Sequence, residues 1–384
     1  MNSKYILFFI AAISITSCIK FPENTYVSPL VIPANFDWKS IEAKTVILTK
    51  TSSVLNENGD TVAAFIPPGE YSLKVGKETT LRIVEEVDNV QTKVPQNFKQ
   101  RIYFPSKKKF ATVMFEDLFP NKGDMDMNDI VFGLRIEVDL DNKAKIKQIV
   151  FTIQPRAIGS SYQKIGLAAN ITNFNNTNPN LVESIIHSSD AVLTDFFNVN
   201  FYSPNEYSPE LNNAKSEVIP LTGDFRSYFQ GAEELFLNVR DIDQPLQTET
   251  FEVTILMDDT QNQYSDLTLF DEAAEGKINI DIFPVFDTRD REVHFKGQKP
   301  TERFNLLLFH YTRPKTDFSS LDNWVWAIMS DKSIMHPLEF VKIYNAYPNF
   351  KKWAEGGGFA NINWHIPAIS DSLYTRIDFD YQYN

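Results

Sequence analysis

Residues 115–131 read FEDLFPNKGDMDMNDIV, and the rest of the chain is interpreted around them. An apolar run at 111–115 leads into this stretch and a second, at 130–138, leads out of it. The pattern therefore predicts two strands joined by an acidic loop. Carboxylates packed in one turn repel each other unless a cation binds between them. The loop offers six side chains with suitable oxygens: Glu116, Asp117, Asp124, Asp126, Asn128 and Asp129.

The alternation of Asp124, Asp126 and Asn128 predicts a calcium site. Ca²⁺ takes about six to eight oxygen ligands at about 2.3–2.6 Å and tolerates irregular geometry, so the other acidic residues of the loop and a backbone carbonyl would complete the shell. An EF-hand does not fit, because its sixth and twelfth positions need Gly and Glu, where this chain has Asp129 and Arg135. Two alternatives are a solvated acidic turn and a Mn²⁺–nucleotide-sugar site, which would need alternating strands and helices.

The same stretch resembles the signature of the LruC-type domain family, bacterial and often lipid-anchored surface proteins without an assigned biochemical function. The resemblance covers roughly residues 100–365 and departs from the family pattern at Val325, where Pro is usual, and at His336, where Tyr is common. Further matching stretches are Tyr103-Phe104-Pro105, Asp281-Ile282-Phe283-Pro284, Arg291-Glu292-Val293-His294-Phe295, Lys299-Pro300-Thr301, Trp324-Val325-Trp326-Ala327-Ile328, His336-Pro337-Leu338-Glu339, Ala346-Tyr347 and Trp353-Ala354-Glu355-Gly356-Gly357.

The N-terminus has the pattern of a bacterial lipoprotein signal. Lys4 supplies positive charge, residues 5–15 form an apolar run too short for a comfortable membrane span, and small residues precede Cys18. Cleavage would leave Cys18 as the first residue, carrying lipid; as the sole cysteine it cannot form an intramolecular disulfide. We expect residues 1–18 to be the signal peptide, 19–35 a tether, and the outer membrane of the cell envelope to be the location.

Short β-prone runs separated by turn residues predict a mostly β fold. Residues 36–98 are expected to form a small N-terminal β-sandwich, 99–370 a larger jelly-roll-like β-sandwich of the LruC type, and 371–384 a tail or strand. Runs at 130–140 and 146–154 predict a hairpin around Asp141-Asn142-Lys143, whereas the polar stretch 160–230 predicts long surface loops. One C-terminal helix is expected over 337–353, with a kink or a division into two short helices at Pro348.

Composition and motifs narrow the function classes. A formal net charge of −13 argues against nucleic acid as a partner and suits cation binding. The five His show no zinc-type spacing, and no nucleophile elbow or phosphate loop is present. Aromatic residues near the predicted helix are expected in the core rather than on a sugar platform: Trp324, Trp326, Trp353 and Trp364.

These observations predict a lipid-anchored, calcium-stabilised cell-surface protein without catalytic activity. It would bind or display a glycan or a surface protein, with the membrane reached through lipid on Cys18. The alternative is a glycoside hydrolase-like enzyme acting on surface polysaccharide, which needs two carboxylates about 5–10 Å apart. A second acidic set is interpreted as caps and turns, with a second cation site as the alternative: Asp241, Asp243, Asp258 and Asp259.

Overall fold

The computed structural model describes residues 30–86, 100–173, 181–188, 197, 201–203, 206–207, 209–213, 216–258, 263–271, 276–310 and 316–379. The predicted signal peptide 1–18, with Cys18, and most of the tether 19–35 lie outside these residues. Residues from Val31 onward form one compact unit. None of the helices in the described ranges is long and apolar enough to cross a membrane.

The structure is mostly β, with 41% strand and 9% helix, so the predicted mostly β, sandwich-like class is confirmed. The largest sheet has 12 strands, and β7 (Ala111–Phe115) branches from it to pair with both β8 and β19 (Ala327–Ser330). Its other strands follow the order β12 (Phe201–Ser203), β13 (Glu206–Tyr207), β11 (Val182–His187), β16 (Phe251–Met257), β9 (Ile146–Ala157), β8 (Ile130–Leu140), β6 (Gln100–Phe104), β3 (Thr61–Ile66), β2 (Ser52–Leu55) and β5 (Arg82–Glu85).

Two smaller sheets pack with the large one. β1 (Ile41–Leu48) and β4 (Gly69–Gly76) form an antiparallel ribbon. The other is a five-stranded sheet, in which only β17 and β18 pair in parallel among its described strands. Its order is β14 (Glu210–Asn213), β15 (Ser216–Thr222), β10 (Ile165–Asn173), β18 (Ile278–Phe286) and β17 (Leu267–Leu269).

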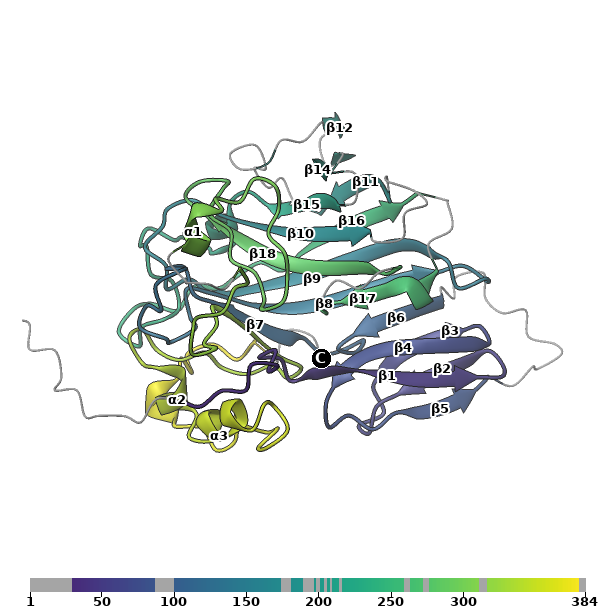
Figure 1. Cartoon of the computed structure of the whole chain (residues 1–384), viewed down its shortest axis with the longest axis horizontal. Helices are drawn as coiled ribbons and strands as arrows, with labels where there is room; N and C mark the ends of the chain where they lie inside the picture. Colours follow the sequence, from purple (N-terminus) through teal and green to yellow (C-terminus); the bar gives the residue numbers. More distant parts are fainter. Residues whose placement is uncertain are drawn as a thin grey trace, which may run out of the picture. The chain divides into compact units, whose positions relative to one another are not determined.

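The core lies between the five-stranded sheet and the centre of the large sheet. Ile136 and Phe151 of the large sheet share one buried apolar cluster with Ile165 and Ile280 of the five-stranded sheet, and Figure 1 shows β10 and β18 lying along β8 and β9. Strands covered on both faces read as nearly continuous apolar runs, which explains the imperfect alternation of residues 130–140. The predicted hairpin is present, with the Asp141 N–H bonded to the Lys145 carbonyl at 2.9 Å.

One sheet crosses the domain boundary that the sequence predicts near residue 98. β3 pairs with β6, placing Ala63 opposite Ile102, and β6 pairs with β8. The strands from residues 36–98 therefore extend the large sheet, and a single apolar cluster includes residues from both sides of the boundary. Edge pairing satisfies backbone groups that a separate small sandwich would leave exposed.

The predicted C-terminal helix is two short helices, α2 (Ile343–Ala346) and α3 (Phe350–Glu355). Pro348 lies between them, since proline cannot donate the backbone hydrogen bond that would continue a helix. Pro337 is outside both helices and forms a bridge with Leu373. The remaining helical turns are α1 (Leu307–His310) and the 3₁₀ turns Phe225–Tyr228, Tyr264–Asp266 and Ser370–Ser372.

One other prediction needs correction. Residues 160–230, expected as surface loops, contain the central strands β10 and β15, whose apolar residues are buried. The short length of each apolar run concealed them, because polar residues separate the runs. The segment 371–384, expected as a tail or strand, is described to residue 379: Leu373, Tyr374 and Ile377 are buried, and Leu373 forms a β-bridge with Pro337.

An aromatic cluster joins the first described residues to the closing helices. Trp38 lies 4.9 Å from Phe36 and 5.1 Å from Trp324, measured between ring centroids. Trp353 lies 4.8 Å from Phe36 and 5.1 Å from Trp364. The prediction that the four tryptophans near the closing helices are core residues is confirmed, since all four are buried: Trp324, Trp326, Trp353 and Trp364.

Replacing Trp38 with alanine should destabilise the fold strongly. The side chain is 0% exposed and its indole N–H donates to the Asn323 carbonyl at 3.0 Å, so its removal leaves a cavity and should cost about 3–5 kcal/mol of unfolding free energy. Ile47→Ala is the control, because Ile47 is 69% exposed and should change stability by about 0.5 kcal/mol or less. Equal urea midpoints for the two variants would contradict this role of the aromatic cluster.

Candidate metal centre

The acidic loop occupies residues 116–129, between β7 and β8. These two strands pair in antiparallel fashion, and Phe115 stands opposite Ile130 at the mouth of the loop. The N–H of Glu116 donates to the carbonyl of Trp326, the residue before β19, at 2.9 Å. This hydrogen bond holds the start of the loop next to β19. The sheet therefore fixes both ends of the loop, and the carboxylates between them have little freedom to separate.

Three carboxylates of the loop converge on one point. Glu116, Asp124 and Asp126 each offer an oxygen, and these atoms all lie within 4.8 Å of one another. Two oxygens bound to one Ca²⁺ at about 2.3–2.6 Å can be separated by at most about 5 Å. The spacing therefore fits a shared cation. Glu116 and Asp126 are buried, whereas Asp124 is half-buried and lies toward solvent.

Three buried oxygen atoms around the loop accept no hydrogen bond from the described residues: Glu116 Oε2, Asn128 Oδ1 and Glu339 Oε2. A Cβ placed on Gly159 would lie 2.0 Å from Asn128 Oδ1 and 2.9 Å from Glu339 Oε2. These two oxygens thus approach the same bare stretch of backbone, which only glycine leaves open. Buried polar atoms without partners are rare and call for an explanation, and a bound cation would supply one.

The raised pKa values of the clustered carboxyl groups also favour a bound cation. Burial, followed by the negative charge of neighbouring carboxylates, raises the pKa of Glu116 and Asp129 well above the usual range. The same causes raise the pKa of Asp126 to about 8 and that of Glu339 to about 7. In the absence of a cation, the fold favours the protonated forms of these groups. A divalent cation among them would reverse that preference.

Asp117 and Asp129, also predicted as ligands, hold the loop in place. The N–H of Asp117 donates to Asp129 Oδ2 at 2.7 Å, and the Ser160 hydroxyl donates to Asp117 Oδ2 at 2.5 Å. Of the six predicted residues, the structure brings together the oxygens of Glu116, Asp124 and Asp126. Asn128 is fixed beside them, because its side-chain N–H donates to the Pro337 carbonyl at 3.2 Å.

Residues 337–343 clamp the loop from a distant part of the chain. The N–H of Phe340 donates to Asp126 Oδ2 at 2.8 Å, across 214 positions. The N–H of Ile343 donates to the Met125 carbonyl at 2.9 Å. This clamp carries Glu339, a candidate ligand that the loop pattern does not reveal. Glu339 does belong to a stretch that carries the family resemblance, His336 to Glu339, which is the sequence signal that could have found it.

Backbone strain is concentrated where the loop and the clamp meet. Met125, Met127 and Phe340 have φ values of 65°, 60° and 65°. Residues other than glycine rarely adopt this left-handed backbone conformation, and each instance costs about 1–3 kcal/mol. The two methionines alternate with Asp124, Asp126 and Asn128 and bend the chain into a compact arc. Such strain persists where the surroundings enforce it, and functional sites are a common location.

Comparison with protein families gives a match to one described as a domain of unknown function (DUF4842), over residues 144–365. The chain belongs to this family. The DUF4842 match includes Gly159 and the clamp, and it begins after the acidic loop. The prediction of a domain without an assigned function is thereby confirmed. The LruC-type name stays a prediction.

A solved structure of similar fold is the crystal structure of a "Putative lipoprotein" from Bacteroides ovatus. The two share 15% sequence identity at a TM-score of 0.54, over 87% of this chain and 93% of the other. At this identity the similarity concerns the fold. No curated protein matches the sequence.

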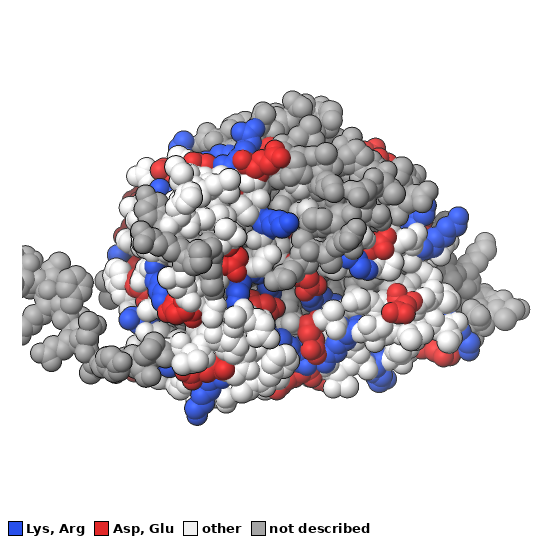
Figure 2. All heavy atoms as spheres, viewed as in Figure 1, with Lys and Arg blue, Asp and Glu red and all other residues white. Residues whose placement is uncertain are grey.

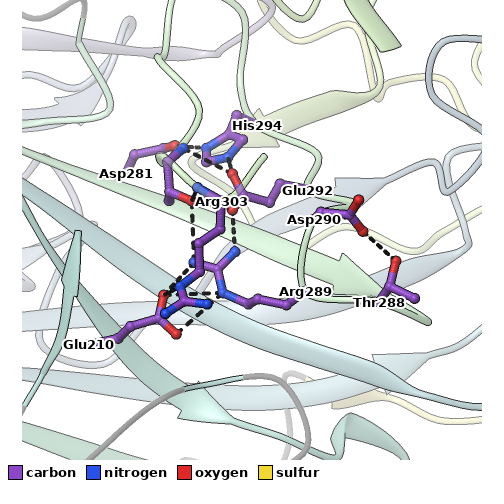
Figure 3. Close-up of polar contacts among 9 residues, drawn as sticks. Glu210, Asp281, Thr288, Arg289, Asp290, Glu292, His294 and Arg303 are labelled. Carbon is purple, nitrogen blue, oxygen red and sulfur yellow. Dashed lines mark hydrogen bonds and ion pairs between the residues drawn. The ribbon is translucent and has the colours of Figure 1, made fainter. Parts of the chain in front are cut away.

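The DUF4842 segment also contains a buried charge network around His294 (Figure 3). One ring nitrogen lies 2.5 Å from Asp281 Oδ2 and the other 2.9 Å from Glu292 Oε2. Glu292 pairs with Arg289, which also pairs with Glu210. His294 is 0% exposed and both ring nitrogens are occupied, so it has no free position for proton transfer to a substrate. The arrangement reads as a structural lock rather than a catalytic dyad.

The other sequence candidates do not form a second centre. Within the ranges that the structure describes, the loop trio is the one group of three or more His, Cys, Asp or Glu side chains close enough to share a metal. Asp243 lies near Tyr374, whereas Asp258 lies near Glu217. The second acidic set is therefore divided between two places; Asp259 is outside the described residues.

His294 should make stability depend on pH. Its two carboxylate partners outweigh the effect of burial and raise its pKa from 6.5 to about 8. The imidazolium therefore stabilises the fold fully below about pH 6.5, and this contribution disappears as the pH rises through about 8. The difference in unfolding free energy between the native chain and His294→Gln should shrink by about 1 kcal/mol between pH 7 and pH 9.

His336→Gln is the matched control for this titration. Burial lowers the pKa of His336 to about 4, so it is neutral throughout that range. The difference between the native chain and His336→Gln should stay constant from pH 7 to pH 9. Urea unfolding at three pH values measures both differences. A His294→Gln difference that does not change with pH would refute the charged lock.

Proposed function

We propose that the protein is a lipid-anchored component of the bacterial cell envelope, located at the outer membrane, that binds or displays a surface ligand without catalysis.

In this proposal, a calcium ion bound by the acidic loop stabilises the folded protein. The observation that carries this proposal is the set of unpartnered buried oxygens of Glu116, Asn128 and Glu339 beside the carboxylates of Asp124 and Asp126. Oxygen-only donors, several of them carboxylates, are what Ca²⁺ prefers. The site lacks His or Cys among these residues, which disfavours zinc.

The calcium ion is proposed in a structural role. Glu116 and Asp126 are buried and the clamp covers them, so the ion would bridge the β7–β8 loop to residues 337–343. Bridging two segments far apart in sequence stabilises the folded state over the unfolded one, in which those ligands are dispersed. A glycan or a surface protein remains the proposed ligand class for the molecule as a whole.

The lipid anchor rests on the N-terminal pattern and on the name of the Bacteroides ovatus protein of similar fold. Cys18→Ala should abolish lipid labelling and release the protein from the membrane fraction. Labelling with a radioactive or clickable fatty acid, followed by membrane fractionation, measures both effects. Unchanged labelling and fractionation of the variant would rule out Cys18 as the anchor.

Calcium should raise the melting temperature of the full chain purified in detergent. Extracellular calcium modules bind with dissociation constants of about 10⁻⁴–10⁻³ M, so a tenfold excess would contribute about 1.4 kcal/mol and a shift of a few degrees. Asp126→Ala should lose the shift. Magnesium should produce little change, because it requires tighter octahedral geometry. The measurements are thermal melting and calorimetric titration with calcium. If the native chain shows neither a heat of binding nor a change in melting temperature at about 10 mM calcium, well above that range, the calcium site is disproved.

Glu339→Gln tests the ligand supplied by the clamp. The substitution keeps the shape of the side chain and removes one negative charge, so calcium affinity should fall while the calcium-free fold is not destabilised. Glu70→Gln is the matched control, since Glu70 is exposed on β4. If Glu339→Gln and Glu70→Gln show the same calcium-dependent shift as the native chain, Glu339 is not a ligand.

A further inference from the structure

A polar pocket of about 450 Å³ lies away from the acidic loop. We call it the lysine pocket, after Lys39, Lys77 and Lys296, which line it with Asp37, Glu42, Asp271, Phe36, Phe270 and Phe359. Its walls come from the segment before β1, the end of β4, the loops after β17 and β18, and the turn after α3. Its volume falls within the range of about 300–1,000 Å³ that is usual for small-molecule sites.

The lysine pocket gathers three lysines in a chain whose formal charge is −13. Each carboxylate that lines it already has a lysine partner: Asp37 lies 3.5 Å from Lys39, Glu42 lies 3.1 Å from Lys44, and Asp271 pairs with Lys74. Three lysines and three carboxylates line the pocket, but Glu42 and Asp271 pair with Lys44 and Lys74, which lie outside its lining. Figure 2 shows acidic and basic side chains gathered on the face between β1 and the closing helices. Two of the three lining carboxylates are thus engaged by other lysines, and a ligand that pairs with a lysine of the pocket would be an anion.

Lys77 has only a distant counter-ion. Its side chain is 9% exposed, and its nearest carboxylate oxygen, Asp37 Oδ1, lies 3.9 Å away and also serves Lys39. Burial lowers the pKa of Lys77; Asp37 opposes this effect, and Lys39 adds to it by repulsion. A buried ammonium group without a close counter-ion is unfavourable. An anion entering the pocket would provide that counter-ion.

Aromatic rings flank the same ammonium group. Lys77 Nζ lies 5.3 Å from the centre of the Phe359 ring and 5.8 Å from that of Phe36. Phe359 is 75% exposed, so its ring is open to contact with a ligand. Gly358 permits this approach: its φ is +81°, and an added Cβ would lie 2.7 Å from Lys77 Nζ. The site therefore offers a cation and an apolar ring surface side by side.

We infer that the lysine pocket binds an acidic sugar, with the carboxylate of the sugar at Lys77 and its apolar C–H face on Phe359. A carboxylated sugar ring carries both features in one small molecule, whereas an inorganic anion uses only the charge and a neutral sugar only the ring surface. This inference deepens the proposed role in surface binding by naming the ligand class. It does not depend on calcium, because none of the pocket residues belongs to the acidic loop or to the clamp.

Calorimetry with the full chain in detergent tests the ligand class. Digalacturonic acid is the probe, galactobiose is the neutral control, and sodium sulfate is the inorganic anion. The inference expects saturable binding of digalacturonic acid that weakens as salt is added, and no saturation by galactobiose at the same concentration. Equal binding of galactobiose, or displacement of the acid by sulfate at equal concentration, would overturn it, as would absence of binding by the acid.

Two variants locate the site. Lys77→Met keeps most of the side-chain volume and removes the charge, and should weaken digalacturonic acid binding about tenfold or more. Phe359→Ala removes an exposed ring, so this variant should fold even if Lys77→Met does not. Its binding of digalacturonic acid should also weaken. Lys50→Gln is the control: Lys50 is an exposed lysine whose ion pair with Glu85 lies outside the pocket, and its binding should equal that of the native chain.

Native affinity in Phe359→Ala would overturn the location. The calcium-dependent melting shift is measured on the same proteins. A shift without sugar binding would overturn this inference alone, whereas sugar binding without a shift would overturn only the calcium site.

Discussion

The burial of several carboxylates at one point is the constraint on which the arrangement around the β7–β8 loop depends. Glu116, Asp124 and Asp126 bring their oxygens within 4.8 Å of one another, and burial of Glu116 and Asp126 removes the water that would screen their repulsion. Backbone N–H groups offset part of this cost by donating hydrogen bonds to the carboxylates. The Met127 N–H donates to Glu116 at 2.6 Å, and the Phe340 N–H donates to Asp126 at 2.8 Å. The Asn128 N–H also donates to Asp126 Oδ1 at 3.3 Å, whereas Glu116 Oε2 has no donor among the described residues, so the cluster is complete only with a proton or a cation.

The large sheet makes that concentration of charge possible. β7 and β8 are held by neighbours on both sides, β19 beside β7 and β9 beside β8. The loop ends therefore cannot move apart to relieve repulsion. The aromatic cluster of Trp38, Trp324 and Trp353 packs the closing helices against the first described residues, and the clamp precedes those helices in the chain. Packing in one place thus keeps the clamp within reach of the loop in another.

Charge is handled differently in the three polar regions of the molecule. In the His294 network, buried carboxylates meet His294 and Arg289 at close range, so most of the charge is compensated internally. In the acidic loop, negative charge is in excess; in the lysine pocket, the ammonium group of Lys77 has only a distant counter-ion. Groups that are buried with an unbalanced charge are candidates for ligand binding, whereas balanced networks more often hold the fold.

The sequence by itself determined the local features. Turn residues at 141–143 and apolar runs on either side specify the β8–β9 hairpin, and Pro348 specifies the break between α2 and α3. The alternation of Asp124, Asp126 and Asn128 specifies the loop, because neighbouring residues on a short arc stay close whatever the rest of the chain does.

Only the tertiary structure decided which distant residues meet the loop. Glu339 and Gly159 come from other strands and loops, and no local period connects them with residue 128. The joining of β3 to β6 and the assembly of the lysine pocket from five segments were equally hidden. The physical reason is that pairing of sheet edges and packing of side chains depend on the complementarity of surfaces far apart in sequence, which a pattern read within a short window does not contain.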